Sequence, residues 1–420
     1  MLYLNDNYYD SEHFERCYRR FDAVAAISEC KGRRLTVCLS DPVEWIALCL
    51  YVKARGGSVL PLHPTTPLEA ARRLGRRSGS YALIFDQIER IELQPDSAAE
   101  VPPGLVQLSS GTTGEPKCIE RSWEAIDREL EDYLEALPQA REMTPIIACP
   151  VTHSYGLICG VLASLARGQE AHVLTQLNPK YVLRKLAQLP QPLLYAAPTL
   201  LHVLTRLLPQ GEKLFAVMTS GAVMPKAHFE ALRERSVHLF QQYGCSEAGC
   251  VAINTDTRSA CAMGRPLARY QVESGSSADA PSEVIIRGAE QAIYTRDLGY
   301  FDSDGVLHYL ARIDDMINVA GINVYPKEVE DVVLTCEGVV DVVVFKRADP
   351  YAGERVCLQF VADRMVDEDE LRRWCAEHLS PYQCPLEIAQ VEEIPKLPNG
   401  KISRRLLADQ VGHSAEQLSA

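Results

Sequence analysis

The sequence predicts an α/β protein, and three observations support this fold class. Apolar runs of strand length alternate with amphipathic helices over roughly the first 260 residues, which is the pattern of βαβ units around a parallel sheet. From about residue 262, short strands and turn signals replace this alternation, and an α+β segment runs from about residue 315 to the end. At 420 residues, the chain is long enough for two or three domains.

The first strand–helix unit carries the clearest local signals. Residues 33–40 predict a buried strand and residues 41–56 a helix, with Asp41 as N-cap, Pro42 at the first position and Gly56 as the stop. The same periodicities predict further helices at 11–31, 66–79, 123–139, 156–168, 181–189, 199–208 and 227–236. They also predict strands at 58–64, 81–86, 106–108, 144–151, 170–175, 192–198, 213–221, 282–288, 292–297 and 305–315.

The amino-acid composition limits which classes of partner and which cell compartment we expect. The net charge of −13 argues against nucleic acid as a general partner, because a phosphate backbone needs a basic surface. The fourteen cysteines show no C-x-x-C and no zinc-type spacing, which is typical of reduced thiols in a cytosolic protein. No apolar run approaches the length of a membrane span, and the N-terminus lacks a signal-peptide pattern. We therefore expect a soluble cytoplasmic protein.

The stretch Ser109–Lys117, SSGTTGEPK, follows an apolar strand but favours neither helix nor strand. Its glycines allow backbone angles closed to other residues, and its hydroxyl side chains favour turns. One interpretation is a mobile surface turn. The other is an anion-binding loop, in which backbone N–H groups, hydroxyls and Lys117 bind the oxygens of a polyphosphate. A Walker-type loop is not supported, because no Ser or Thr follows the lysine.

Four further clusters combine aromatic, glycine and charged residues. Each one alone is more often structural than functional, so their order along the chain is more informative. They are QQYGCSEAG (241–249), YTRDLGYFDSDG (294–305), ARIDDMINVAGINVYPKEVE (311–330) and LPNGKISRR, in which Lys401 directly follows an Asn-Gly turn dipeptide.

Taken in order, the glycine-rich loop and these clusters resemble the motifs of the adenylate-forming superfamily, which includes acyl-CoA synthetases, peptide-synthetase adenylation domains and luciferases. The resemblance covers roughly residues 30–407. It implies a large multi-layer α/β N-terminal domain over residues 1–312, with a shortened N-terminal subdomain, and a small α+β C-terminal lid domain over residues 313–420. It also implies an AMP-forming acid–thiol ligase that uses ATP and Mg²⁺.

The resemblance also implies a role for each matching residue. The implied phosphate-binding residues are Ser109, Ser110, Gly111, Thr112, Thr113 and Gly114, with Lys117 as an added positive charge. The implied adenine and ribose contacts are Gly221, Ala222, Tyr243, Asp297 and Arg312. Glu247 is the implied Mg²⁺ ligand, and Lys401 the lid lysine that contacts the substrate carboxylate and the α-phosphate; with Thr112, they are the implied catalytic residues. The remaining roles are an acid pocket (His153, Gly221, Cys245), a hinge (Asp314) and a thiol channel (Gly321).

The resemblance says less about which carboxylic acid the protein activates. Relatives that activate α-amino acids commonly carry an aspartate just after the position of His153, whereas residues 151–161 contain no acid. This favours an aryl or acyl carboxylic acid, activated to an acyl-adenylate with release of pyrophosphate. The acyl group would then pass to a phosphopantetheine thiol, either of CoA or of a carrier protein. Two alternatives stay open: an amino-acid-activating enzyme that loads a carrier protein, and a non-catalytic nucleotide-binding relative.

Overall fold

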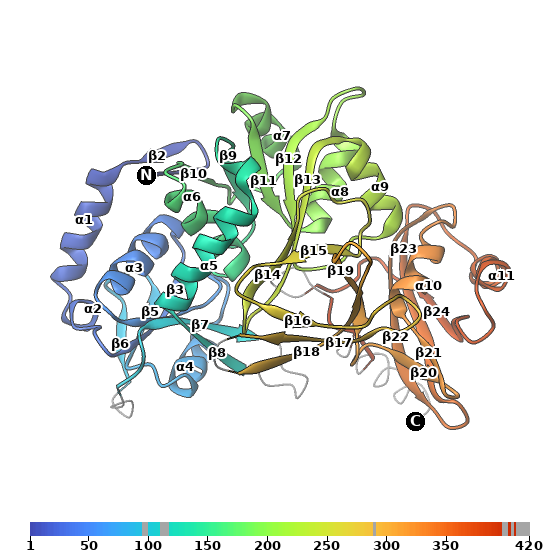
Figure 1. The fold of residues 1–420 in the computed structure, drawn as a ribbon. Helices are drawn as coiled ribbons and strands as arrows, with labels where there is room; N and C mark the ends of the chain where they lie inside the picture. Colours follow the sequence, from blue (N-terminus) through green and yellow to red (C-terminus); the bar gives the residue numbers. More distant parts are fainter. Residues whose placement is uncertain (95–99, 110–116, 289–290, 397–401, 405–406, 409–420) are drawn as a thin grey trace. The chain divides into compact units, whose positions relative to one another are not determined.

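A computed structural model of the chain describes residues 1–94, 100–109, 117–288, 291–396, 402–404 and 407–408 (Figure 1). These residues form two compact units. Unit 1 contains those within Met1–Gly221, Ser236–Thr255 and Leu267–Arg269, and unit 2 those within Ala222–Arg235 and Asp256–Pro266 and from Tyr270 onward. The boundary expected at residue 312 lies inside unit 2, and a division into domains at that residue stays a prediction.

Unit 1 begins with a six-stranded sheet in the order β6-β5-β3-β4-β7-β8. Strands β5, β3, β4 and β7 run parallel, and the edge strands β6 and β8 are antiparallel to their neighbours. All of β3 is buried, as expected for a strand covered on both faces. The strands are β3 (Arg34–Leu39), β4 (Ser58–Pro61), β5 (Ala82–Asp86), β6 (Ile91–Leu93), β7 (Gly104–Ser109) and β8 (Lys117–Ser122).

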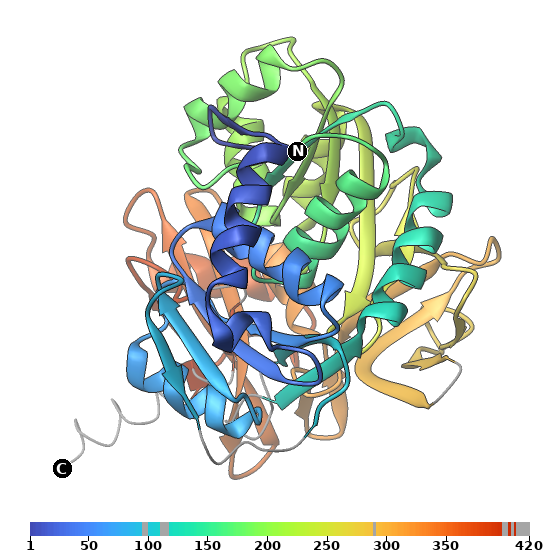
Figure 2. The same cartoon turned by 90° about the vertical axis from the view of Figure 1, so that its left-hand side faces the viewer.

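Helices cover both faces of this sheet. They are α1 (Ser11–Asp22), α2 (Ala25–Ser28), α3 (Pro42–Ala54) and α4 (Leu68–Arg77). The start of α3 is as predicted, because the Asp41 side chain accepts a hydrogen bond from the backbone N–H of Val43. Helix α1 lies beside α3, where the rings of Phe21 and Tyr51 have centroids 5.4 Å apart (Figure 2). Helix α4 packs on the other face, on which Cys38 of β3 lies.

A second sheet in unit 1 has the order β14-β13-β12-β11-β9-β10-β1-β2. The pairs β13–β14 and β1–β2 are antiparallel, and the other neighbours are parallel. The strands are β1 (Leu2–Leu4), β2 (Asn7–Tyr9), β9 (Thr144–Ala148), β10 (Ala171–Val173), β11 (Pro192–Ala196), β12 (Leu214–Thr219), β13 (Ser236–Cys245) and β14 (Gly249–Asn254). Helices α5 (Trp123–Ala136), α7 (Pro179–Gln188) and α8 (Pro198–Leu207), with a 3₁₀ turn at Pro138–Ala140, connect them.

The segment predicted as one helix over 156–168 differs from the prediction. It is a π-helix, η2 (Tyr155–Leu162), followed by the short helix α6 (Ala163–Ala166). A Cβ atom on Gly156 would lie 2.4 Å from the carbonyl oxygen of Pro150, so only glycine allows this close approach of the two backbones. Such wide turns inside helices are frequent at functional sites.

Unit 2 contains an antiparallel sheet in the order β16-β17-β18-β19-β15. The short strands that the sequence predicts in this region correspond to β17, β18 and β19. The elements are α9 (Lys226–Glu234), β15 (Ala262–Pro266), β16 (Gln271–Glu273), β17 (Ser282–Arg287), β18 (Ala292–Phe301) and β19 (Leu307–Arg312).

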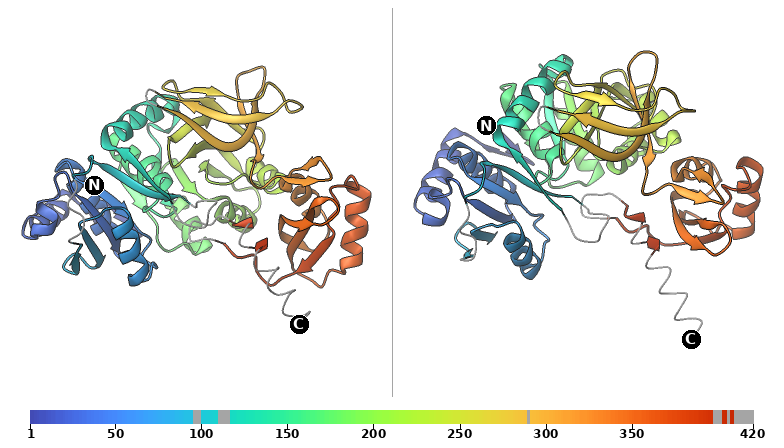
Figure 3. Two further views of the ribbon diagram at one scale, coloured as in Figure 1. Left: turned by 90° about the horizontal axis from the view of Figure 1, so that it is seen from below. Right: turned by 60° about the horizontal axis from the view of Figure 1, so that its bottom comes forward.

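The last part of unit 2 is an α+β fold, orange to red in Figure 3. Its sheet has the order β21-β20-β23-β22, with β24 beside β23. Val329 of α10 and Leu371 of α11 pack with Phe360 of β23, so both helices cover the same face. The elements are β20 (Ile317–Val319), β21 (Ile322–Val324), α10 (Pro326–Val333), β22 (Val339–Asp349), β23 (Gly353–Ala362), α11 (Glu368–His378) and β24 (Glu387–Gln390).

The predicted α/β class, with a smaller α+β part towards the C-terminus, is confirmed. Among the described residues, none of the helices combines the length and the apolar character that crossing a bilayer requires.

Candidate active site

The glycine-rich loop joins two strands of the first sheet. Strand β7 ends at Ser109 and β8 begins at Lys117, and these two residues are register partners in an antiparallel ladder. Lys117 is exposed. The other expected phosphate contacts lie outside the described residues, so their role stays a prediction, as does that of Ser109 and Lys117. They are Ser110, Gly111, Thr112, Thr113 and Gly114.

A buried ion pair anchors the strand that leaves this loop. Arg121 of β8 and Glu129 of α5 form a salt bridge, and their side chains are only 5% and 1% exposed. The same carboxylate accepts a hydrogen bond from the backbone N–H of Cys250 at 2.7 Å. It therefore ties β8 and α5 to the start of β14, three residues after Glu247. Sequence reasoning did not identify this pair, although Glu129 is spaced three residues from Ile126 on the apolar face of its helix.

The segment around His153 contacts strands of both sheets in unit 1. The hydroxyl of Ser154 donates a hydrogen bond to Gln107 of β7, and that of Tyr155 donates to the backbone oxygen of Met218 in β12 at 2.5 Å. Burial raises the pKa of Tyr155 well above its usual value, so this hydroxyl keeps its proton. His153 itself is partly exposed. The structure thus places His153 beside the strand that enters the glycine-rich loop.

Tyr243 and Gly221 lie at the ends of neighbouring strands. Tyr243 is near the end of β13 and is 7% exposed. Its parallel neighbour β12 ends two residues before Gly221, and the Ser220 hydroxyl donates to the backbone oxygen of Gln242 at 3.4 Å. Gly221 has φ of +90°, a conformation that favours glycine. Ala222, its expected partner at the purine, belongs to unit 2. Purine stacking on Tyr243 stays a prediction.

Glu247 lies on the tight turn that joins β13 to β14. Its side chain is exposed, and Cys245, just before the turn, is partly exposed. A Cβ on Gly244 would lie 2.1 Å from the carbonyl oxygen of Gly249, so the two strands approach too closely there for any side chain. Among the described residues, no group of three His, Cys, Asp or Glu side chains is arranged to hold a metal ion. A single exposed carboxylate fits Mg²⁺ carried by a polyphosphate, because Mg²⁺ takes one or two carboxylates plus phosphate oxygens.

The two expected ribose contacts are adjacent in unit 2. Asp297 of β18 and Arg312 of β19 are register partners, and Oδ1 of the aspartate lies 3.6 Å from Nε of the arginine. The Asp297 side chain is 10% exposed and that of Arg312 is 45% exposed. The hydroxyl of Thr295 accepts a hydrogen bond from the backbone N–H of Asp297 at 3.1 Å. A buried carboxylate thus lies beside a partly exposed guanidinium, and this pair of groups suits two ribose hydroxyls.

The expected hinge and thiol-channel residues follow directly along the chain. Oδ1 of Asp314 lies 2.8 Å from Nη2 of Arg296, an exposed ion pair across β18 and the turn after β19. Gly321 lies in the turn between β20 and β21 with φ of +87°. Apart from Gly321 and its two chain neighbours, no described atom lies within 4 Å of the position of a Cβ on Gly321, so the backbone angle and not crowding explains the glycine here.

Lys401 lies outside the described residues, but Arg404, three residues later, is firmly held. Its guanidinium contacts Glu330 of α10 at 2.7 Å and Asp315 at 3.4 Å, and Nε donates to the backbone oxygen of Val344 at 2.9 Å. Burial lowers the pKa of Arg404, but the two carboxylates outweigh this effect and raise it. The segment after Lys401 is thus attached to α10 and β22.

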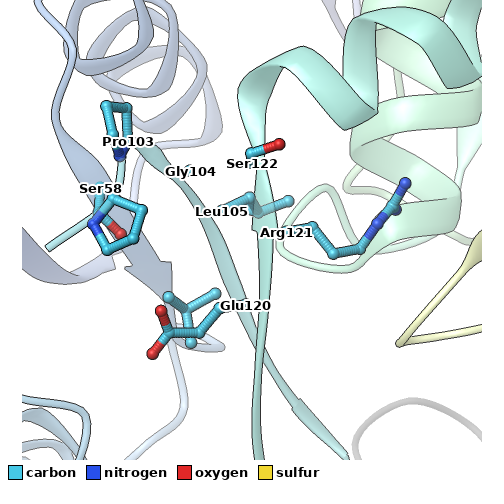
Figure 4. A pocket seen from close by; sticks show the side chains of 9 residues that line it. Ser58, Pro103, Gly104, Leu105, Glu120, Arg121 and Ser122 are labelled. Carbon is cyan, nitrogen blue, oxygen red and sulfur yellow. The ribbon is translucent and has the colours of Figure 1, made fainter. Parts of the chain in front are cut away.

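A small pocket lies at the end of the β7–β8 ladder that is far from the glycine-rich loop (Figure 4). Its volume is about 140 Å³, and Ser58, Gly104, Glu120 and Arg121 are among its lining residues. The ladder runs from the pair Gly104–Ser122 at this end to the pair Ser109–Lys117 at the loop. At about 3.4 Å per residue, the two ends are roughly 17 Å apart.

Comparison with known sequences identifies the family. Residues 93–289 match the model of the AMP-binding enzyme family, and residues 328–401 that of the AMP-binding enzyme C-terminal domain. The chain is 39% identical over 409 residues to a 3,4-dihydroxybenzoate–[aryl-carrier protein] ligase of Bacillus anthracis. The aligned region covers 97% of this chain and 98% of that protein. The chain is 24% identical over 455 residues to the long-chain-fatty-acid–CoA ligase FadD13 of Mycobacterium tuberculosis, with 93% and 90% covered.

Comparison with solved structures supports the same fold. The o-succinylbenzoate coenzyme A synthetase of Bacillus subtilis in complex with AMP has a TM-score of 0.81 at 21% identity, with 97% of this chain and 94% of that chain covered. The ATP-bound MatB of Rhodopseudomonas palustris has a TM-score of 0.82 at 19% identity, with 97% and 95% covered. The chain therefore belongs to the family of AMP-binding enzymes, which is the adenylate-forming superfamily that its ordered motifs predict.

Proposed function

We propose that the protein activates an aryl carboxylic acid, of the dihydroxybenzoate class, with ATP and loads it onto the phosphopantetheine thiol of an aryl carrier protein. One observation carries this proposal: the chain is 39% identical over nearly its whole length to a 3,4-dihydroxybenzoate–[aryl-carrier protein] ligase. Two CoA-ligase relatives are less similar: FadD13 is 24% identical over 93% of the chain, and a 2-succinylbenzoate–CoA ligase of Listeria monocytogenes is 27% identical over 72% of it.

The first half-reaction forms an acyl-adenylate. The substrate carboxylate attacks the α-phosphorus of ATP, and pyrophosphate leaves. Catalysis of this kind depends on positioning and on charge stabilisation, because no covalent bond to the protein is required. In this role Asp297 and Arg312 would hold the ribose, and Glu247 would hold Mg²⁺, which supplies positive charge to the phosphates when bound.

The acid pocket proposed around His153 supports an aryl substrate. Residues 151–161 carry no carboxylate that could pair with an α-ammonium group. The π-helix that follows His153 is formed by buried apolar residues, including Leu157, Ile158 and Val161. A benzoate has no ammonium group that needs such a carboxylate, and apolar surroundings suit its ring.

The acceptor thiol is tested by comparing two acceptors in separate reactions. The full chain, ATP, Mg²⁺ and 3,4-dihydroxybenzoate are incubated with a holo aryl carrier protein or with CoA, and thioesters are measured by mass spectrometry. We expect the carrier thioester to form at least about tenfold faster than the CoA thioester, and an apo carrier to stay unmodified. Formation of the CoA thioester alone would contradict the proposed acceptor and leave acid activation intact.

The hinge role of Asp314 gives a prediction about the second half-reaction. Asp314→Pro fixes φ near −65° and should restrict rotation of the following segment, so thioester formation falls further than adenylate formation. Asp314→Ala is the matched control. It removes the ion pair with Arg296 but keeps the backbone freedom, and an exposed pair contributes about 1 kcal/mol or less. Single-turnover measurement of each half separates the two, and equal losses in both halves of Asp314→Pro would contradict a hinge.

A further inference from the structure

A cysteine, a histidine and an aspartate form a connected cluster in unit 2, and none of them has a role in the proposed reaction. Sγ of Cys261 lies 3.8 Å from Nδ1 of His308, within hydrogen-bond range for sulfur. Nε2 of the same imidazole lies 2.8 Å from Oδ2 of Asp302. The hydroxyl of Ser259 lies 3.1 Å from the sulfur. The cluster thus contains a nucleophile (Cys261), a base (His308) and a carboxylate that orients the base (Asp302), connected in that order.

The backbone holds these side chains in register. His308 lies on β19, where it pairs with Ala262 of β15 on one side and with Tyr300 of β18 on the other. Its ring is stacked on Tyr300, with centroids 4.8 Å apart and an angle of 6° between the planes. The backbone N–H groups of residues 304 and 306 donate to Oδ1 of Asp302 at 2.9 Å, which leaves Oδ2 directed at the imidazole. The imidazole is therefore fixed by stacking, by pairing and by a carboxylate.

The electrostatics of the cluster favour a thiolate. Burial alone would raise the pKa of the Cys261 thiol, but hydrogen bonds from His308 and Ser259 outweigh it and hold that pKa below its usual value. The contact with the thiol, with Asp302 behind it, raises the pKa of His308. At Cys384, another partly exposed cysteine of unit 2, burial also raises the pKa, and there the net shift is upward.

A metal site is a poor interpretation of this cluster. Both ring nitrogens of His308 already face partners, the thiol on one side and the carboxylate on the other. No group of three ligating side chains in the described part of the chain is arranged for a metal ion. Cys261 is instead a partly exposed residue whose sulfur contacts the imidazole and a hydroxyl.

We propose that Cys261 is a nucleophilic thiol that forms mixed disulfides with low-molecular-weight disulfides. Its thiolate attacks one sulfur of the small disulfide, the original sulfur–sulfur bond breaks, and a bond between Cys261 and the attacked sulfur forms. The other half leaves as a thiolate that takes a proton from solvent. The cysteine sulfur is oxidised and the small disulfide is reduced, so no further oxidant is required.

The test compares two cysteines in the same molecule. The full chain is treated with glutathione disulfide between about pH 5.5 and pH 9 and quenched with acid, and peptide mass spectrometry measures the adduct on Cys261 and on Cys384. At about pH 6 we expect Cys261 to react roughly threefold faster or more, because its larger thiolate fraction outweighs the lower nucleophilicity of a more acidic thiol. Its rate–pH profile should have the lower midpoint.

Variants then test whether the imidazole of His308 causes the lower midpoint of the Cys261 rate–pH profile. The groups that contact the thiol are Ser259 from its own loop and His308 from β19. Tyr300 of β18 stacks on the imidazole, and Asp302 contacts its other nitrogen. His308→Gln should move the Cys261 midpoint to higher pH, and Asp302→Asn should move it less in the same direction. His378→Gln, at an exposed histidine of α11, is the matched control and should leave the profile unchanged.

Two results would overturn the proposal. One is equal reactivity of the two cysteines at about pH 6, which requires no variant and is independent of any effect of mutation on folding. The other is a Cys261 profile that stays unchanged in both His308→Gln and Asp302→Asn. Neither result bears on the proposed ligase activity, which is measured with other substrates.

Discussion

Glu129→Gln is expected to destabilise unit 1 by about 3–5 kcal/mol, the typical cost of removing one partner from a buried ion pair. The substitution keeps the shape of the side chain and an oxygen that can accept from the backbone of Cys250, so little cavity forms. It removes the negative charge that faces the buried guanidinium of Arg121. Urea unfolding of the purified variant measures the loss.

Two further variants test whether the loss of stability comes from the buried charge or from any glutamate substitution on α5. Glu131→Gln changes an exposed glutamate on the same helix and should lie within about 0.5 kcal/mol of the parent. The double variant Arg121→Met, Glu129→Gln removes both charges and should recover most of the lost stability. A double variant as unstable as Glu129→Gln would show that an unpaired charge is not the cause.

Lys401→Ala is expected to slow adenylate formation by about 10²–10³-fold, by analogy with the loss of one positioned donor at a developing oxyanion. The reason is the proposed contact between its ammonium group and the α-phosphate. Lys396→Ala is the matched control, because Lys396 is a cation nearby in the sequence whose Nζ lies 3.1 Å from Asp341, a partner in β22. We expect the control to keep nearly the parental rate.

The second half-reaction distinguishes a catalytic from a structural loss. Supplied with ready-made acyl-adenylate and a thiol acceptor, Lys401→Ala should form thioester at close to the parental rate. A collapse of this step as well would contradict an adenylation-specific role for the lysine.

Local signals in the sequence were sufficient for the elements that frame the site. The cap at Asp41 with Pro42 correctly gave the start of α3. The ordered motifs correctly gave the family. Each of these depends on residues close together in the chain, where spacing alone carries the information.

Contacts between distant residues were not predictable in the same way. Strands β1 and β2 have three residues each; β1 pairs with β10, about 170 residues away, and β2 pairs with β1. A glutamate on a helix is usually exposed. The burial of Glu129 is favourable only because Arg121 and the backbone of Cys250 approach its carboxylate. Cys261 and His308 are separated by 47 positions and meet only because β15 pairs with β19.

The measurement that most directly tests the proposed function is ATP–pyrophosphate exchange across a panel of acids: 3,4-dihydroxybenzoate, other benzoates, medium-chain fatty acids and α-amino acids. Exchange reports adenylate formation alone and does not depend on the acceptor thiol. We expect the fastest exchange with a dihydroxybenzoate and background rates with amino acids, because residues 151–161 offer no carboxylate to an α-ammonium group. Fastest exchange with an amino acid, or no exchange with any acid, would contradict the proposal that this protein activates aryl acids.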